Sequence, residues 1–352
     1  FVYDVVWTHV ILPVQSITAA GSGARIIMKS QPFRDAQIKG GVQVRDPSYI
    51  ENAYELLDQP GEWYLNRTTQ QLYYIPKANE NMATIEVVAP VLEQFVTVTG
   101  TLDTPVHNIQ FQGLNFIYAT FLRPSVMGHA EVQANMIKDP AEDILVHSSF
   151  LKSNASVVLD AAKSITLERS NFSKIGGAAI NIQNGSENNI IRGSTLTQIG
   201  GNGIIVGDFT RFDAHPTDVR AIVKNNTIIN NYFDSIAQIY KGGAAITVGY
   251  TDGTVISHNE IRNTAYTGIS LGWGWGYWDQ GGRSDAPAYY PVYTVPTVAK
   301  NNRIEYNKIH NTMQVLNDGG AIYTLGMMPF SIIRDNFYYD NDYNSIGLYA
   351  DS

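Results

Sequence analysis

The chain has 352 residues, of which 44% are hydrophobic and 16% are charged, so it can form one large solenoid or two ordinary domains and is too apolar to be disordered. Its 24 Lys and Arg residues against 32 Asp and Glu residues give a formal net charge of -8, which argues against nucleic acid as a partner. No run approaches the roughly 20 apolar residues that span a bilayer, so we expect no membrane anchor, and the absence of Cys excludes disulfides and thiolate metal sites.

Residues 1–103 are predicted to form a β-rich N-terminal region, composed of an early coil and an inserted β subdomain. Between about residues 61 and 76, two alternating segments rich in Trp and Tyr flank a polar turn. This pattern predicts a β-hairpin with aromatic cross-strand pairs. Farther along the chain, residues 119–142 interrupt the repeat pattern, and the segment 131–137 is a candidate for one short helix.

From residue 104 to residue 352 one pattern recurs: an aliphatic run, a corner with Asn or Ser, a second apolar run, and a small residue followed by an aliphatic one. The closest corners are 22 residues apart, from Ser149 to Asn171, and 23 residues apart, from Asn171 to Ser194. Such a spacing suits a coil of three short strands. Stacked Asn side chains can form a hydrogen-bonded ladder at these corners. The other corners are expected at Asn115, Asn226, Asn259, Asn307 and Asn336.

These repeats predict an all-β fold, a right-handed parallel β-helix, with an antiparallel β-sandwich as the alternative. The aliphatic residues that follow Gly or Ala should form one interior column of the helix, because the small residue permits close backbone approach. Since Ser352 ends the chain within the repeat pattern, we expect the solenoid to be truncated at its C-terminal end. The predicted column consists of Ile180, Ile204, Ile246, Ile269 and Ile322.

The longest insertion in the repeat lies between Asn259 and Asn307 and carries Trp273, Trp275 and Trp278. Aromatic faces can stack on the C–H faces of sugar rings, so these three residues are candidate substrate-binding residues. We expect residues 273–299 to overhang the groove of the solenoid. The alternative is a loop that packs its aromatic side chains against its own solenoid.

Asp318 precedes Gly319 and Gly320, at a position where earlier coils carry a non-acidic residue. Glycoside cleavage needs two carboxyl groups that converge on one bond. Equivalent positions of stacked coils lie about 4.8 Å apart, so acids on neighbouring coils can form such a pair. Asp340 and Asp342 are rival candidates because they form an acidic turn one coil later. The alternative role of Asp318 is that of a turn residue which accepts backbone hydrogen bonds.

Three segments resemble bacterial parallel β-helix proteins around glycoside hydrolase families 141 and 120. They are residues 51–65, residues 268–276 (Gly-Ile-Ser-Leu-Gly-Trp-Gly-Trp-Gly) and residues 316–326 (Leu-Asn-Asp-Gly-Gly-Ala-Ile-Tyr-Thr-Leu-Gly). The resemblance covers most of the chain in the same order. It implies a carbohydrate substrate more firmly than any particular sugar, because members of these families act as β-xylosidases, α-L-fucosidases and xylanases.

The resemblance also implies a pair of catalytic carboxyl groups, one in the Asp-Gly-Gly run and one in the next coil. The first is Asp318 and the second is Asp351, although Ala350 and Ser352 depart from the Gly-Ile-Tyr-Leu-Asp-Glu ending of the relatives. Asn317 and Tyr323, in the same run as Asp318, join the substrate-binding candidates.

The sequence thus predicts an extracellular or periplasmic glycoside hydrolase that cleaves polysaccharide or oligosaccharide. A polysaccharide lyase, or a glycan-binding or adhesive solenoid without catalysis, is the alternative. Clustered cations in the groove would favour a lyase, which has to neutralise a uronate. No cluster of metal ligands and no phosphate-binding Gly loop is recognisable in the sequence, so we expect no metal or cofactor.

Overall fold

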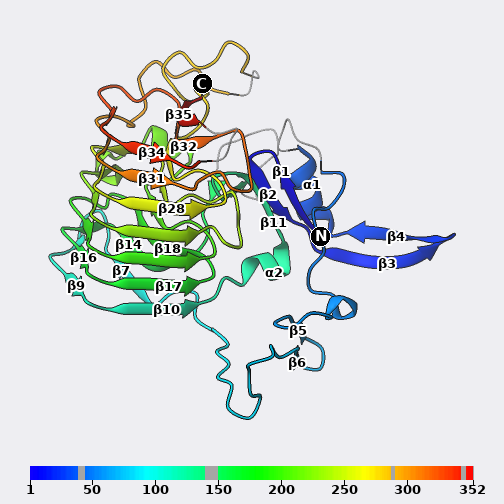
Figure 1. The fold of residues 1–352 in the computed structure, drawn as a ribbon. Helices are drawn as coiled ribbons and strands as arrows, with labels where there is room; N and C mark the ends of the chain where they lie inside the picture. Colours follow the sequence, from blue (N-terminus) through cyan, green and yellow to red (C-terminus); the bar gives the residue numbers. More distant parts are fainter. Residues whose placement is uncertain (39–43, 139–149, 287–289, 342–345, 352) are drawn as a thin grey trace.

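The computed structural model describes residues 1–38, 44–138, 150–286, 290–341 and 346–351. Most of the described chain winds into stacked coils whose strands run parallel in three sheets (Figure 1). Each complete coil places one strand in each sheet, in the same order, before the chain rises to the next coil. This architecture is the predicted right-handed parallel β-helix, and the parallel pairing rules out the β-sandwich alternative.

Two of these sheets have seven strands each. The first comprises β9 (Gln110–Gln112), β16 (Thr166–Glu168), β19 (Ile190–Arg192), β23 (Thr227–Ile229), β27 (Val255–Ser257), β30 (Arg303–Glu305) and β33 (Ile332–Arg334). The second comprises β10 (Asn115–Ala119), β17 (Asn171–Ile175), β20 (Thr195–Ile199), β24 (Tyr232–Ile236), β28 (Glu260–Thr264), β31 (Lys308–His310) and β34 (Phe337–Tyr339).

The third sheet has eight strands and carries the candidate site described below. It comprises β7 (Val96–Thr99), β14 (Ala155–Asp160), β18 (Ala178–Gln183), β21 (Ile204–Val206), β25 (Ile246–Val248), β29 (Ile269–Gly272), β32 (Gly320–Leu325) and β35 (Ile346–Ala350). Because β7 already pairs with β14, the stack begins ahead of residue 104, where the repeat pattern placed its start. Two short parallel pairs flank the sheets: β8 (Val106–His107) with β15 (Ala162–Lys163), and β22 (Val223–Lys224) with β26 (Thr251–Asp252).

The interior of the coils is filled by aliphatic columns, and the predicted Ile column is confirmed. Ile180, Ile204, Ile246, Ile269 and Ile322 are consecutive partners in the parallel register, and each is 0% exposed. Removing this much apolar surface from water is the main stabilising contribution to the solenoid.

The corner between the two seven-stranded sheets carries the expected ladder, but three predicted corners differ from it. Asn115 and Asn171 begin strands β10 and β17, one position after the ladder, and Ser149 lies outside the described residues. In this ladder, each backbone N–H group donates to the Asn side chain of the next coil. Ser194 donates to Asn231 at 2.9 Å, Asn231 donates to Asn259 at 3.0 Å, and Asn259 donates to Asn307 at 3.0 Å. Asn226 was the wrong residue for this ladder, because its side chain accepts from Asn189 in a separate corner. The misplacement arose because Asn occurs in both corners of this coil.

The N-terminal residues pair with a segment that leaves the solenoid more than a hundred positions later. β1 (Val2–Val5) and β2 (Thr8–Ile11) form an antiparallel sheet with β11 (His129–Gln133), β12 (Met136–Lys138) and β13 (Phe150–Leu151). The expected helix at residues 131–137 is therefore wrong. Alternate residues of β11 are buried, which is the period of a strand, and the helix in this excursion is instead α2 (Arg123–Met127).

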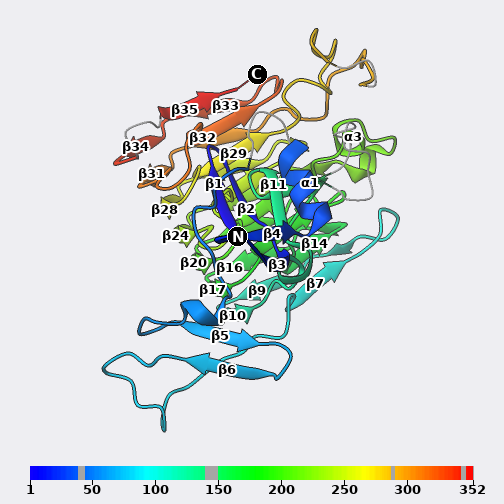
Figure 2. The same ribbon diagram turned by 90° about the vertical axis from the view of Figure 1, so that its right-hand side faces the viewer.

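In the rest of the N-terminal region, one helix packs against this sheet through Ala36, and one hairpin lies below the first coils of the solenoid (Figure 2). The region contains the hairpin β3 (Val14–Ala20) and β4 (Gly23–Met28), helix α1 (Ser30–Ile38) and the 3₁₀ turn Tyr54–Leu56. The hairpin expected at residues 61–76 is confirmed as β5 (Trp63–Asn66) and β6 (Gln71–Tyr74), in which Trp63 pairs with Tyr74 and Tyr64 with Tyr73.

A second hydrophobic core covers the outer face of the eight-stranded sheet. Phe150 of β13 and Trp273 and Trp278 of the long insertion pack there against Ile205 and Tyr323. Helix α3 (Arg211–Ala214) contributes Ala214 to this core, and the 3₁₀ turn Val219–Ala221 follows it in the chain. Among the helices that the structure describes, none is long and apolar enough to cross a membrane.

Candidate functional site

Asp318 lies in the turn that leads into β32, and the two glycines after it explain the shape of that turn. A Cβ atom on Gly319 would lie 2.9 Å from both Tyr266 and Met313, and one on Gly320 would lie 2.5 Å from the carbonyl oxygen of Ile346. Neither distance is compatible with a side chain. The turn therefore packs closely against its neighbours, and Asp318 itself adopts a left-handed φ of 60°.

This turn is also held from outside the solenoid. The Tyr266 hydroxyl donates to the carbonyl oxygen of Asp318 at 2.9 Å and accepts from Gln133 of β11 at 3.0 Å. The side chain of Asp318 remains exposed, whereas partial burial was expected beside Gly319 and Gly320. The difference arises because the close packing of this turn involves its backbone and not the carboxyl group.

Two acids and two tyrosines form crossed pairs between the last two coils. Tyr349 of β35 donates to Oδ1 of Asp318 at 2.8 Å, and Tyr323 of β32 donates to Oδ2 of Asp351 at 2.6 Å. The two tyrosines are register partners, and their rings stack with centroids 5.2 Å apart. The stacked tyrosines thus connect Asp318, which precedes β32, with Asp351, which follows β35, on the last two strands of the eight-stranded sheet.

Both phenols remain hydrogen-bond donors well above neutral pH. The hydrogen bond to Asp318 raises the pKa of Tyr349 to about 12. Burial, followed by the hydrogen bond to Asp351, raises the pKa of Tyr323 well above its ordinary value. Each phenol therefore orients the carboxyl group that it contacts.

A cavity of about 370 Å³ brings these residues together with two other parts of the chain. The solenoid contributes Asp318, Tyr323 and Asp351 to its wall. The long insertion contributes Gly274, Trp275, Tyr277, Trp278, Arg283 and Tyr290, and the N-terminal sheet together with its partner strands contributes Trp7, Val132, Gln133 and Phe150. A volume of this size is within the range of small-molecule sites.

The insertion is braced by Arg283 at the cavity wall. Its guanidinium group forms a two-pronged ion pair with Asp285, at 2.9 and 2.8 Å, and donates to the carbonyl oxygen of Trp275 at 3.1 Å. The same group lies over the ring of Tyr277, 4.9 Å from its centroid. The hydrogen bond to Asp285, with a smaller contribution from the charge of Asp351, raises the pKa of Arg283 against the opposing effect of burial. The loop that carries the tryptophans is thus tied to a cation beside the candidate acids.

The structure separates the three predicted tryptophans. Trp275 and Trp278 line the same cavity as Asp318, as expected for an insertion that overhangs the groove. Trp273 does not line this cavity. It is 1% exposed, and its ring lies 5.0 Å from that of Phe150 and 5.2 Å from that of Phe209. The chain turns directly after Trp273, because Gly274, Trp275 and Gly276 have left-handed φ values of 89°, 46° and 79°, so only part of the aromatic run reaches the cavity.

The remaining predicted residues fall outside the cavity wall or outside the described residues. Asn317 is exposed, and its backbone N–H donates to the carbonyl oxygen of Val6 at 2.8 Å. Asp340 is exposed in the turn after β34, where its carbonyl oxygen accepts from Asn311. Neither residue lines the cavity. Asp342 lies outside the described residues.

Sequence reasoning missed the contribution of the N-terminal region. Trp7 occupies the turn between β1 and β2, and Gln133 ends β11. Both line the cavity, although they are separated from Asp318 by roughly half the chain or more. No motif marked them, because they belong to no repeat. The one available signal was an isolated Trp in a short turn.

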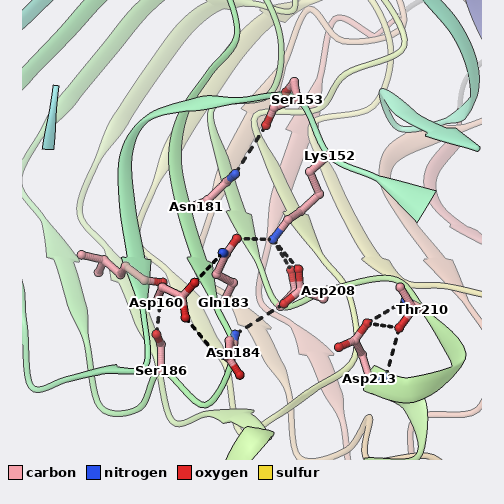
Figure 3. A network of polar contacts seen from close by, with 12 residues as sticks. Lys152, Ser153, Asp160, Asn181, Gln183, Asn184, Ser186, Asp208, Thr210 and Asp213 are labelled. Atoms are coloured by element: carbon pink, nitrogen blue, oxygen red, sulfur yellow. Dashed lines mark hydrogen bonds and ion pairs between the residues drawn. The ribbon is translucent and has the colours of Figure 1, made fainter. Parts of the chain in front are cut away.

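A second polar cluster lies on an earlier part of the same sheet (Figure 3). Lys152 forms an ion pair with Asp208 at 2.5 Å and donates to Gln183 at 2.9 Å, and Gln183 in turn donates to Asp160 at 3.0 Å. The neighbouring Asp213 caps α3 through Thr210. Burial and the charge of Asp208 raise the pKa of Asp213. These acids bind partners within the fold and do not line the cavity.

The residue types that line the cavity are those that cleavage of a bond to a sugar requires. Two carboxyl groups can supply a proton donor and a nucleophile or base, and aromatic side chains of the wall can contact an apolar ring face. No group of three or more His, Cys, Asp or Glu side chains suited to a metal ion occurs among the described residues.

Comparison with protein families gives two matches. The model described as "GH141 insertion domain" matches residues 1–77, and the model described as "Right handed beta helix region" matches residues 155–352. The second match covers more than half of the chain. No curated protein matches the chain significantly.

Among solved structures, one titled "Glycoside hydrolase" is 29% identical to the chain, with a TM-score of 0.83. The match covers 97% of this chain and 59% of that one, so the chain spans about three fifths of the length of this relative. A structure titled "The complex structure of XylC with xylose" is 14% identical, with a TM-score of 0.46, over 85% of this chain and 46% of that one. An alginate lyase from Paenibacillus sp. is 13% identical, with a TM-score of 0.33, over 73% of this chain and 80% of that one.

Proposed function

This chain belongs to the right-handed β-helix family, and we propose that within this family it is a glycoside hydrolase. The observation that carries the proposal is the pair of phenol-bound acids, Asp318 and Asp351, in one cavity with Trp275 and Trp278. The matched insertion domain and the structure titled "Glycoside hydrolase" support the same activity. The substrate that we propose is a polysaccharide or oligosaccharide. Since such glycans lie outside the cytoplasm, an extracellular or periplasmic location follows from this proposal.

The two acids differ in their surroundings, and this difference suggests their roles. Asp351 accepts from Tyr323, whose phenol is buried and fixed as a donor, so we assign Asp351 the role of the carboxylate that attacks or activates water. Asp318 is exposed and accepts from the partly buried Tyr349, so it can exchange its proton with solvent. We assign Asp318 the role of the acid that protonates the leaving oxygen.

A polysaccharide lyase is less compatible with this cavity. A lyase has to neutralise the carboxylate of a uronate before it removes a proton, which requires cations near the substrate. Among the described residues that line the cavity, Arg283 is the single cation, and its guanidinium group forms an ion pair with Asp285. Asp318 and Asp351 would repel a uronate.

The test of the proposal starts with a panel of 4-nitrophenyl glycosides of neutral pentoses, hexoses and 6-deoxyhexoses, in both anomeric forms. On a substrate that the wild type cleaves, Asp318→Asn and Asp351→Asn should each lower kcat by about 100-fold or more. Asp340→Asn is the matched control, because this exposed acid lies one coil from Asp318 and outside the cavity. It should leave kcat unchanged.

A second comparison separates the roles of the two acids. A 2,4-dinitrophenyl leaving group needs little protonation, so Asp318→Asn should lose less activity on the dinitrophenyl glycoside than on the 4-nitrophenyl glycoside, whereas Asp351→Asn should lose activity on both. Folded variants of both acids with normal kcat would refute the proposed site. Formation of an unsaturated uronate from an acidic polysaccharide would instead establish a lyase.

A further inference from the structure

Trp7 is held at the cavity by its own indole N–H group and by the turn that carries it. It follows Val6 in the tight turn between β1 and β2, and the carbonyl oxygen of Val6 accepts from Asn317, the residue before Asp318, at 2.8 Å. The indole N–H of Trp7 donates to the carbonyl oxygen of Val132 in β11 at 3.1 Å. The ring is therefore fixed in direction and lies beside the turn that carries the candidate acid.

The ring of Trp7 both packs against the fold and lines the cavity. It packs against a buried cluster of Tyr266, Met313 and Leu316, yet it remains partly exposed and lines the cavity wall. Since its N–H group already binds Val132, the group that Trp7 offers to a ligand is its apolar face. A flat, rigid, apolar surface is suited to the C–H face of a sugar ring.

A purely structural role for Trp7 would be to anchor the N-terminal sheet to the solenoid. Other contacts already make this connection. Lys241 of the solenoid forms an ion pair with Asp4 of β1 at 3.1 Å, and the Asn317 backbone bonds Val6. Within the N-terminal sheet, β2 pairs with β11. A residue that only anchored the sheet would also not need to be partly exposed at the cavity, as Trp7 is.

We propose that Trp7 is a substrate-stacking residue, and that the N-terminal region thereby completes the sugar site formed by Asp318, Asp351 and the tryptophans of the insertion. This inference rests on the proposed function and extends it. The sugar ring whose bond is cleaved lies between the Trp7 face and the insertion, so that the domain matched at residues 1–77 takes part in recognition and not only in folding.

The test compares Trp7→Phe with Trp7→Leu in the full chain. Phe keeps a flat aromatic face and loses the indole N–H, whereas Leu keeps apolar bulk and loses the flat face. On the active 4-nitrophenyl glycoside, stacking predicts that Trp7→Leu raises KM by about tenfold or more with a smaller change in kcat, and that Trp7→Phe stays close to the wild type. Trp63→Ala is the control, because Trp63 is 61% exposed in the hairpin and outside the cavity.

An anchoring role predicts a different pattern. Both Trp7 variants would lower Tm through the lost bond to Val132, and their folded fractions would keep the KM of the wild type. That result overturns the inference and leaves the proposed function standing. If the wild type cleaves no glycoside of the panel, free monosaccharides of the same sugars are titrated by calorimetry. If Trp7→Leu binds such a sugar more weakly than the wild type does, Trp7 is a sugar-binding residue even though no hydrolase activity is detected. If the wild type binds none of these sugars, the inference is refuted.

Discussion

The hydroxyl group of Tyr323 donates to the carboxyl group of Asp351 at 2.6 Å, so a buried phenol of one coil orients an acid of the next. Tyr349 makes the reverse connection, from the later coil to Asp318 of the earlier one. Stacked coils can build such crossed pairs because the parallel register places Tyr323 directly beside Tyr349. The parallel register that aligns the core residues of neighbouring coils thus also aligns the two tyrosines that contact the candidate acids.

Tyr323→Phe tests this relationship. The variant keeps the ring stacked on Tyr349 and removes the hydroxyl group that orients Asp351 and also contacts Gln133, so kcat should fall by roughly tenfold or more, with a smaller effect on Tm. Steady-state kinetics on an active aryl glycoside, together with thermal unfolding, measure both quantities. Tyr54→Phe, at an exposed position of the N-terminal region, is the control. A wild-type kcat in the Tyr323 variant would show that the phenol does not orient a catalytic group.

The Ile column predicts a gradient of stability along the solenoid. Ile246 is fully buried between Ile204 and Ile269, so Ile246→Ala should lower the free energy of unfolding by about 2–5 kcal/mol. Leu348 continues the same column but is 43% exposed, and Leu348→Ala should cost clearly less. Chemical denaturation of both variants provides the comparison. Equal losses would contradict the assignment of the column as the core.

The Asn ladder should stabilise the fold through bonds that water cannot replace. Oδ1 of the buried Asn259 accepts from the backbone N–H of Asn231 at 3.0 Å and from its side chain at 3.1 Å. Asn259→Ala leaves these buried donors without an acceptor, at a cost of about 1–3 kcal/mol or more. Asn171→Ala is the matched control, because Asn171 was expected at a corner but begins strand β17 beside the ladder. A similar drop in Tm for both variants would argue against a special role of the ladder.

Acid should loosen the contact between the N-terminal sheet and the solenoid. Burial raises the pKa of Asp4, but hydrogen bonds and charges from His9 and Lys241 outweigh it, so the net shift of this pKa is downward. Because the pKa of Asp4 is lower in the folded state than in the unfolded state, ionised Asp4 stabilises the fold above the pKa of the unfolded state, near pH 4. This stabilisation is lost as the pH falls through the pKa of the folded state. Asp4→Asn should therefore lower Tm at neutral pH and have less effect near pH 2 to 3. Thermal unfolding from about pH 7 to about pH 2 measures the difference, and a constant difference over this range would refute the pairing.

Much of the solenoid could be predicted from the sequence because its contacts are nearly local. Each coil contacts the coils before and after it, so a small residue before Ile180 or Ile322 carries the same meaning at each recurrence. The hairpin at β5 and β6 was predictable for the same reason, since its two strands are neighbours in the chain. Asp318 emerged as a candidate because a departure from a repeat is visible against the repeat, whereas Asp351 was indicated by the resemblance to other β-helix proteins.

The tertiary structure alone decided which residues meet at the cavity. Trp7 and Gln133 reach Asp318 only because β1 and β2 pair with β11, a contact between segments far apart in the chain that no repeat encodes. The Trp-Gly-Trp pattern likewise did not show that Trp275 would line the cavity and Trp273 would enter the core. Burial depends on which surface comes to cover a side chain, and here that surface is supplied by Phe150 and Phe209, which lie outside the insertion.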